Sequence, residues 1–155
     1  MKHFTDSLKY TPCKEALIWL KTQPDAQTAW NKSERGDWML FHAGKLAGAA
    51  GSNARRPLVL AACECARLAL KYVKKDELGP LMVIETAERW ASGNRETTLA
   101  QVRVAADTAD AAAATAAYAA AAATAYAADT AAYADAKILA TCSDIVRKYY
   151  PKVPV

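Results

Sequence analysis

Apolar residues recur along most of this chain at steps of three and four positions, which is the spacing of one face of an α-helix. The pattern predicts a first helix over Cys13–Lys21 and a second, shorter one over Asp25–Lys32. A third is expected over residues 38–48, "WMLFHAGKLAG", with Asp37 as its N-cap. No segment alternates apolar and polar residues or is rich in β-branched side chains, so the sequence predicts no strands.

The fourth predicted helix is the most apolar. It follows the stretch "GSNARRP", with Ser52 or Asn53 as its cap, and runs to about Lys74. Its polar residues form one narrow stripe, made of Glu64, Arg67, Lys71 and Lys74. A helix with so little polar surface is expected at the centre of the domain. A fifth helix is expected over residues 81–91, ended by Gly93.

Alanine dominates residues 106–137, where only Thr, Tyr, Asp and one Lys interrupt it. At helical spacing one broad face holds only apolar or small residues, and its larger members are Leu99, Val102, Ile138, Cys142 and Ile145. The opposite face holds Thr108, Thr115, Tyr126, Tyr133 and Lys137. Alanine has the highest helix propensity, and its small side chain lets another helix approach closely. This alanine face is therefore expected to be a close-packing surface, either within the domain or between copies in a homo-oligomer.

The length of the alanine-rich segment argues that it folds back on the domain. A continuous helix from Asn94 to Tyr149 would be about 80 Å long at about 1.5 Å per residue. A compact domain of this size has a radius of gyration of only about 15 Å. Breaks are expected near Asp107–Asp110 and Asp129–Asp135, where Asp and Thr side chains can cap new helix starts.

These patterns together predict an all-α fold. We expect one compact multi-helix domain over residues 1–155, with an irregular N-terminus over 1–11 and a tail over 151–155. Its long alanine-rich C-terminal segment is expected to form a helical hairpin. A chain of 155 residues is long enough to bury a hydrophobic core of its own.

Composition narrows the class of protein. The chain is 53% hydrophobic and 23% charged, which is typical of globular rather than disordered proteins. Its formal net charge of +4 permits acidic proteins, nucleotides or nucleic acid as partners. The N-terminus has no apolar core of the secretory type, and no strongly apolar run is long enough to span a bilayer. We therefore expect a cytoplasmic protein without a membrane partner, in which all four cysteines are reduced.

Residue types that carry catalysis are sparse. His42 has no Cys, Asp or Glu at ligand spacing, and Cys63 and Cys65 point about 200° apart on a helix, so no metal site is expected. Glu85 and Glu88 are three positions apart but lie beside Arg89, as on an ordinary solvated helix face. No nucleophile elbow, phosphate loop or dinucleotide motif occurs, and the four tryptophans are most simply core residues. We expect no enzyme activity and no cofactor.

One stretch, "GKLAGAAGSNARR", has the character of a ligand site. A glycine-rich loop leads into a helix start, where backbone N–H groups and guanidinium groups can bind a phosphate. The predicted ligand-binding residues are Lys45, Ser52, Asn53, Arg55 and Arg56. The alternative is an ordinary inter-helix loop with solvated arginines, which is the commoner case.

The order of the segments resembles a protein family. "RRPLVLAACECARLALKYV", then "LGPLMVIETAERWASG", then an alanine-rich helical stretch is similar to alanine-rich immunity proteins associated with bacterial polymorphic-toxin systems. The upstream "CKEALIWLK" and "ERGDWMLF" resemble members found in phage genomes. The resemblance covers roughly residues 12–150. It implies an all-α protein that neutralises a protein partner, and it implies no particular binding residue.

Three functions stay open at this point. The first is an immunity-like or inhibitor protein that binds a toxin or a defence protein. The second is a phage-encoded counter-defence protein that sequesters a phosphorylated or nucleotide signal. The third is an ice-binding or structural helical protein, because threonines recur at steps of eleven or twenty-two at Thr97, Thr108, Thr130 and Thr141. The ice-binding pattern is interrupted by Ala119 and by the bulky Tyr126 and Tyr133 on the same face.

Overall fold

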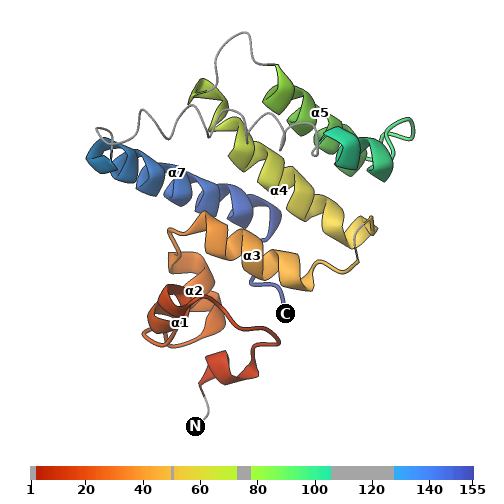
Figure 1. The fold of residues 1–155 in the computed structure, drawn as a ribbon. Coiled ribbons are helices and arrows are strands. Elements are labelled where there is room, and N and C mark those ends of the chain that lie inside the picture. The colour runs from red at the N-terminus through yellow and green to blue at the C-terminus, as the bar shows by residue number, and fades with distance from the viewer. Residues whose placement is uncertain (1–2, 50, 73–77, 106–127) are drawn as a thin grey trace.

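The computed structural model describes residues 3–49, 51–72, 78–105 and 128–155. Within these ranges the regular structure is entirely helical, with no strand, which confirms the predicted all-α class (Figure 1). The α-helices are α1 (Lys14–Leu20), α2 (Ala26–Lys32), α3 (Gly36–Leu46), α4 (Arg56–Arg67), α5 (Gly79–Ala91) and α7 (Ala128–Tyr149). Short 3-10 helices are η1 (Phe4–Ser7), η2 (Asn53–Arg55) and η3 (Leu70–Tyr72), and residues 99–105 are also helical. None of the described helices is both long and apolar enough to cross a membrane.

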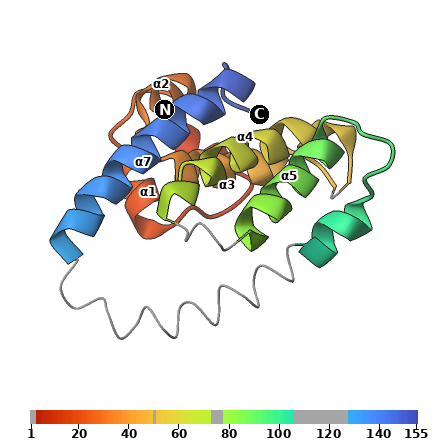
Figure 2. The ribbon, with the colours of Figure 1, turned by 90° about the horizontal axis from the view of Figure 1, so that it is seen from above.

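Helix α4 lies at the centre, as its apolar sequence predicts. It packs against α3, α5 and α7 (Figures 1 and 2). Leu58 and Ala61 of α4 join one core cluster with Trp30, Met39, Ala43, Ala47 and Val146. The predicted polar stripe contacts polar groups of the neighbouring helices: Glu64 accepts hydrogen bonds from Lys148 and Tyr149, and Arg67 pairs with Glu88.

Helices α3 and α7 approach each other closely at Gly36. A Cβ atom at this glycine would stand 2.8 Å from backbone atoms of both Cys142 and Ser143. In the same part of α7, Cys142 and Ile145 are buried with Cys65, while Lys137 is exposed. This part of α7 therefore presents the apolar face that the sequence predicts toward the bundle.

The alanine-rich segment differs in part from the prediction. Helix α7 runs without interruption through residues 129–135, so the break expected there is wrong. The flanking alanines favour continued helix more strongly than Asp and Thr side chains favour a new cap. Because α7 packs against α3 and α4, the C-terminal end of the segment does return to the bundle. The other expected break (Asp107–Asp110), the turn of the hairpin and most of the alanine face lie outside the described residues.

Two other helix boundaries also differ from the predicted ones. Helix α3 begins at Gly36, so Asp37 lies in its first turn and is not its N-cap. The Asp37 carboxylate instead accepts two hydrogen bonds from the Arg35 guanidinium. Helix α4 ends at Arg67, short of the expected Lys74, because the amides of the next two residues bond three positions back and tighten the chain into 3-10 geometry.

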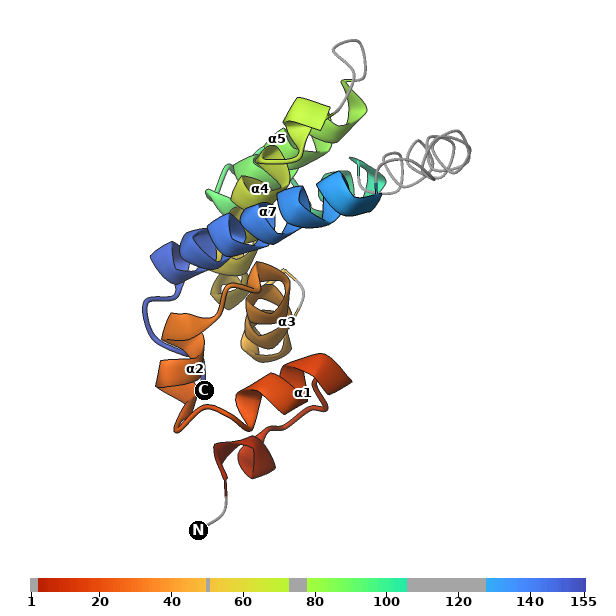
Figure 3. The ribbon, with the colours of Figure 1, turned by 90° about the vertical axis from the view of Figure 1, so that its left-hand side faces the viewer.

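The N-terminal segment, α1 and α2 lie on one side of α3, away from α4 and α5 (Figure 3). The C-terminal residues join this region to the bundle. Trp30 Nε1 donates to the Tyr150 carbonyl oxygen at 2.9 Å, and the Val153 amide donates to the Gln27 side chain at 3.0 Å. The tail over 151–155 is thus packed along α2 and helps to position α1, α2 and α3 around a shared interior.

Candidate functional site

Charged side chains of the glycine-rich loop face separate neighbours. Arg55 Nη1 donates to the Gly48 carbonyl oxygen at 2.8 Å and so closes the loop on itself. The Lys45 ammonium lies 5.0 Å from the centroid of the Phe41 ring on the same helix. Both side chains thus have contacts within the chain.

Arg56 contacts helix α5. Its guanidinium is 5.8 Å from the centroid of the Trp90 ring, and its Nη1 would be 3.1 Å from a Cβ atom at Gly93. Arg56 Nε and Ser52 Oγ are buried and have no hydrogen-bond partner among the described residues, while Asn53 is exposed. The arginine side chain therefore packs against α5 and its C-terminal glycine.

The backbone before α4 also differs from a simple anion-binding helix start. The 3-10 turn η2 precedes the helix, and the Arg55 amide donates to the Ser52 carbonyl oxygen at 3.1 Å. The Arg56 amide donates to the Asn53 carbonyl oxygen. These N–H groups are thus already bonded, and the predicted anion site at Lys45, Ser52, Asn53, Arg55 and Arg56 stays a prediction.

One hollow in the described part of the chain is a cavity of about 430 Å³. It lies between the N-terminal segment, α1, α2 and α3, and Val153 of the tail contributes to its wall. Small-molecule sites in proteins commonly span about 300–1,000 Å³ and are mainly apolar. The aromatic residues of the lining are Phe4, Tyr10, Trp19, Trp30, Trp38 and Phe41.

Helical spacing explains how the sequence builds this cavity. Helix α3 supplies Trp38, Met39 and His42, and Arg35 is its N-cap. Position 35 is three and four residues from 38 and 39, and position 42 is four and three residues from them, so all four share one face. Opposite them stand Ala16 of α1 and Ala26 and Ala29 of α2. Because alanine has no side chain beyond Cβ, the space between the helices is not filled.

A chain of hydrogen bonds marks the inner polar end of the cavity. The Tyr10 hydroxyl contacts His42 Nδ1, and His42 Nε2 lies 3.0 Å from the Pro154 carbonyl oxygen. A carbonyl oxygen only accepts, so Nε2 carries the proton, and Nδ1 of the neutral ring accepts from the Tyr10 hydroxyl. Burial lowers the pKa of His42 and raises the pKa of Tyr10, which keeps both groups neutral near pH 7.

An ion pair between Arg35 and Asp37 lies at the other end of the cavity. Arg35 donates two hydrogen bonds to the Asp37 carboxylate, at 2.9 and 2.7 Å, and these lower the pKa of Asp37. Both side chains are 43% exposed, so they lie at the mouth of the cavity. The Arg35 guanidinium also lies 4.3 Å from the centroid of the Trp38 ring. Two helical turns separate Arg35 from His42, which is about 10 Å at about 1.5 Å per residue.

The arrangement is suited to binding. Both ring nitrogens of His42 have hydrogen-bond partners, so neither is free to move a proton to or from a ligand. The exposed thiol of Cys13 also lines the cavity. Among the described residues, no three His, Cys, Asp or Glu side chains gather closely enough to hold a metal ion.

The sequence pattern does not predict this cavity. All four tryptophans are expected in the core, and Trp30 and Trp90 are indeed buried. Trp19 and Trp38 are only half-buried and stand 6.0 Å apart, centroid to centroid, beside the cavity. The repeat of Arg35, Trp38, Met39 and His42 at helical spacing was the available signal, but the same pattern is equally typical of a filled core.

No family model, curated protein or solved structure matches this chain. The resemblance to immunity proteins therefore remains an expectation from the sequence.

Proposed function

We propose that this chain is a non-enzymatic binding protein that takes a small, mainly apolar molecule into the cavity beside α3. The observation that carries the proposal is the cavity itself, which is about 430 Å³ and surrounded mostly by aromatic and aliphatic side chains. An apolar molecule that leaves water for such a space gains roughly 25 cal/mol for each Å² of surface that it buries.

A phosphorylated ligand is less suited to the cavity. Arg35 is the only arginine among the described residues of its lining, and its charge is offset by Asp37. An anion inside would lose its hydration without gaining an unpaired cation, which is strongly unfavourable. The arginines of the predicted loop, Arg55 and Arg56, are not part of the lining.

A protein partner is the second candidate, as the resemblance to immunity proteins implies. Two large apolar side chains near the cavity are exposed, Ile18 by 59% and Phe41 by 46%. Ile18 belongs to α1 and Phe41 to α3, the helices that form two of the cavity walls. A partner that covers both side chains could insert an apolar anchor residue between them, as protein interfaces commonly do.

A ligand-observed NMR screen of small neutral fragments tests the proposal. Apolar fragments should bind the native chain, and binding should be lost in Ala16→Phe, because Ala16 is buried in the cavity wall. Ile18→Phe is the matched control on the exposed face of the same helix and should bind as the native chain does. Thermal denaturation of both variants checks that they fold. If no apolar fragment binds, or if Ala16→Phe binds as well as Ile18→Phe, the cavity is not the site.

A further inference from the structure

We infer that the ligand of this cavity is a neutral aromatic molecule with a hydrogen-bond donor, and that the Tyr10 oxygen accepts this donor. The inference rests on the proposed function, since it names the chemistry of the molecule that the cavity would take. It follows from three features of the cavity: the direction of the hydrogen bonds at its inner end, the aromatic rings of its wall, and the balanced charges of its lining.

The direction of the hydrogen bonds leaves an acceptor at Tyr10. The Pro154 carbonyl oxygen requires the proton of His42 on Nε2, so His42 Nδ1 requires the proton of the Tyr10 hydroxyl. Once that proton is engaged, only lone pairs remain on the Tyr10 oxygen. A ligand at this end therefore gains a hydrogen bond if it carries an N–H or O–H group, and gains none from a carbonyl or ether oxygen.

The rings beside Tyr10 favour an aromatic ligand. Tyr10 meets the Phe41 ring edge-on, with centroids 5.5 Å apart and planes at 78°. Trp19 and Trp38 form a second pair along the same cavity. Aromatic rings attract one another in edge-to-face and offset geometries beyond the gain from buried area alone. A flat ring can pack against either pair, whereas a flexible chain would lose conformational entropy when it is ordered beside them.

The ionisable groups of the lining favour a neutral ligand. They are Tyr10, Cys13, Arg35, Asp37 and His42. Tyr10 and His42 are neutral near pH 7, as argued above, and the two ions of the mouth offset each other. Neither a cationic nor an anionic ligand would therefore find a lone opposite charge in the wall.

Indole and 1-methylindole form a matched pair of probes. Both are neutral aromatic molecules of similar shape, and only indole has an N–H donor. Their dissociation constants would be measured calorimetrically for the native chain and for Tyr10→Phe. The native chain should favour indole over 1-methylindole about fivefold more strongly than the variant does, since a neutral hydrogen bond contributes roughly that factor. The affinity ratio of indole to 1-methylindole in the native chain is divided by the same ratio in Tyr10→Phe, and this cancels the additional hydrophobicity of the methyl group.

Cys13 provides an independent readout of where the probe binds. Its thiol is exposed and lines the cavity, while Cys63, Cys65 and Cys142 are buried. Saturating indole should slow the alkylation of Cys13 by iodoacetamide at least severalfold in the native chain and in the control Ile18→Phe. The rate should not change in Ala16→Phe, in which the cavity is filled.

Failure of this inference can be told apart from failure of the proposed function. If apolar fragments bind and are lost in Ala16→Phe, but the two indoles keep the same ratio in Tyr10→Phe, the donor assignment is wrong and the cavity remains a binding site. If 1-octanol binds more tightly than indole, the aromatic assignment is wrong. If neither fragments nor indole bind the native chain, both proposals fail together.

Discussion

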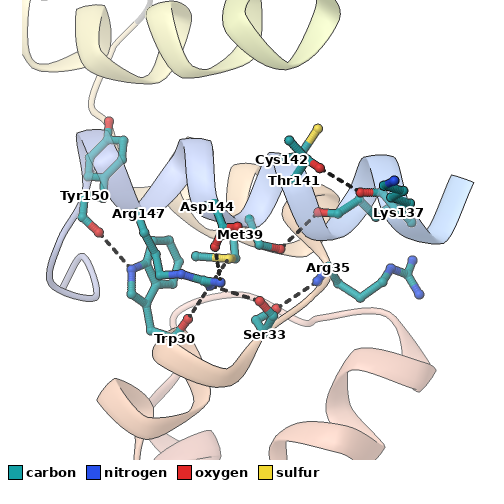
Figure 4. Close-up of polar contacts among 12 residues, drawn as sticks. Trp30, Ser33, Arg35, Met39, Lys137, Thr141, Cys142, Asp144, Arg147 and Tyr150 are labelled. Atoms are coloured by element: carbon teal, nitrogen blue, oxygen red, sulfur yellow. Dashed lines mark hydrogen bonds and ion pairs between the residues drawn. The ribbon is translucent and has the colours of Figure 1, made fainter. Parts of the chain in front are cut away.

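Arg147 of α7 donates a hydrogen bond from Nη1 to the carbonyl oxygen of Ser33 at 2.9 Å, across the interface between α7 and the end of α2 (Figure 4). The same nitrogen lies 3.1 Å from the Trp30 carbonyl oxygen. Both acceptors are at the C-terminus of α2, where backbone carbonyls have no partner within the helix and a positive charge is favourable. The Arg147 guanidinium thus caps the C-terminus of α2 and connects α2 to α7 of the bundle.

Replacing Arg147 should therefore destabilise the fold. Arg147→Met keeps much of the apolar stem but leaves the Trp30 and Ser33 carbonyls without this donor, and we expect a loss of about 2–4 kcal/mol in the free energy of unfolding. Urea denaturation measures it. Arg95→Met, at an exposed position outside the helices, is the control and should change stability by less than about 0.5 kcal/mol. Equal stability of the two variants would contradict this role for Arg147.

Stability should depend on His42 as the pH falls below about 6.5. Burial lowers the pKa of His42 in the folded state, so the unfolded chain, with an ordinary pKa of about 6.5, binds the proton more readily. Stability should therefore be complete above about pH 6.5 and fall as the pH drops toward the folded pKa, by at most about 1.4 kcal/mol per pH unit.

The carboxylates whose pKa is lowered, such as Asp37 and Glu64, weaken the fold only at lower pH, because their ordinary pKa values are 3.8 and 4.5. Melting temperatures of the native protein and of His42→Gln, measured across the pH range in which His42 titrates, separate the effect of His42 from that of the carboxylates. A native profile as flat as that of the variant would rule out His42 as the titrating group.

The sequence predicts local structure better than it predicts the cavity. The start of α2 follows from Asp25, whose carboxylate accepts the Thr28 amide at 2.8 Å, a contact within one helical turn. The central place of α4 follows from its composition. The cavity instead depends on how Tyr10 meets His42, 32 residues away, and on how far α1 stands from α3. No periodicity within one segment contains that information.

The predicted anion site in the glycine-rich loop depends on contacts that no local pattern contains. Glycines followed by two arginines suit an anion, although an ordinary loop is the commoner case. In the structure Arg55 donates to Gly48 within the same loop, and Arg56 packs against Trp90 from another helix. A sequence states which donors are present. It does not state whether carbonyl groups and rings of the same chain already occupy them.

The four thiols should differ sharply in reactivity. Burial raises the pKa of Cys63 to about 11 and raises the pKa of Cys65, which also lies beside Cys142. Because the thiolate is the reactive form, these buried cysteines should be nearly inert in the folded protein, and exposed Cys13 should react rapidly. Ellman's reagent at pH 8 should titrate one thiol quickly and the other three only after denaturant is added. Cys13→Ser should remove the fast phase, and a fast phase of two or more thiols in the native protein would contradict the burial.

Gly36 should be the least replaceable glycine among those at helix starts. A Cβ atom there would stand 2.8 Å from backbone atoms of Cys142 and Ser143, and backbone cannot rotate away as a side chain does. Gly36→Ala should therefore force α3 and α7 apart and cost about 1–3 kcal/mol, the usual range for an overpacked interior. Gly79→Ala is a matched control, because Gly79 is likewise the first residue of its helix, but the added carbon would meet no atom of another described element within 4 Å. The control should be neutral or slightly stabilising, since alanine restricts the unfolded chain more than glycine does. Denaturation of both variants in urea decides the matter: if Gly36→Ala is as stable as Gly79→Ala, the two helices do not touch at this point as the structure has them.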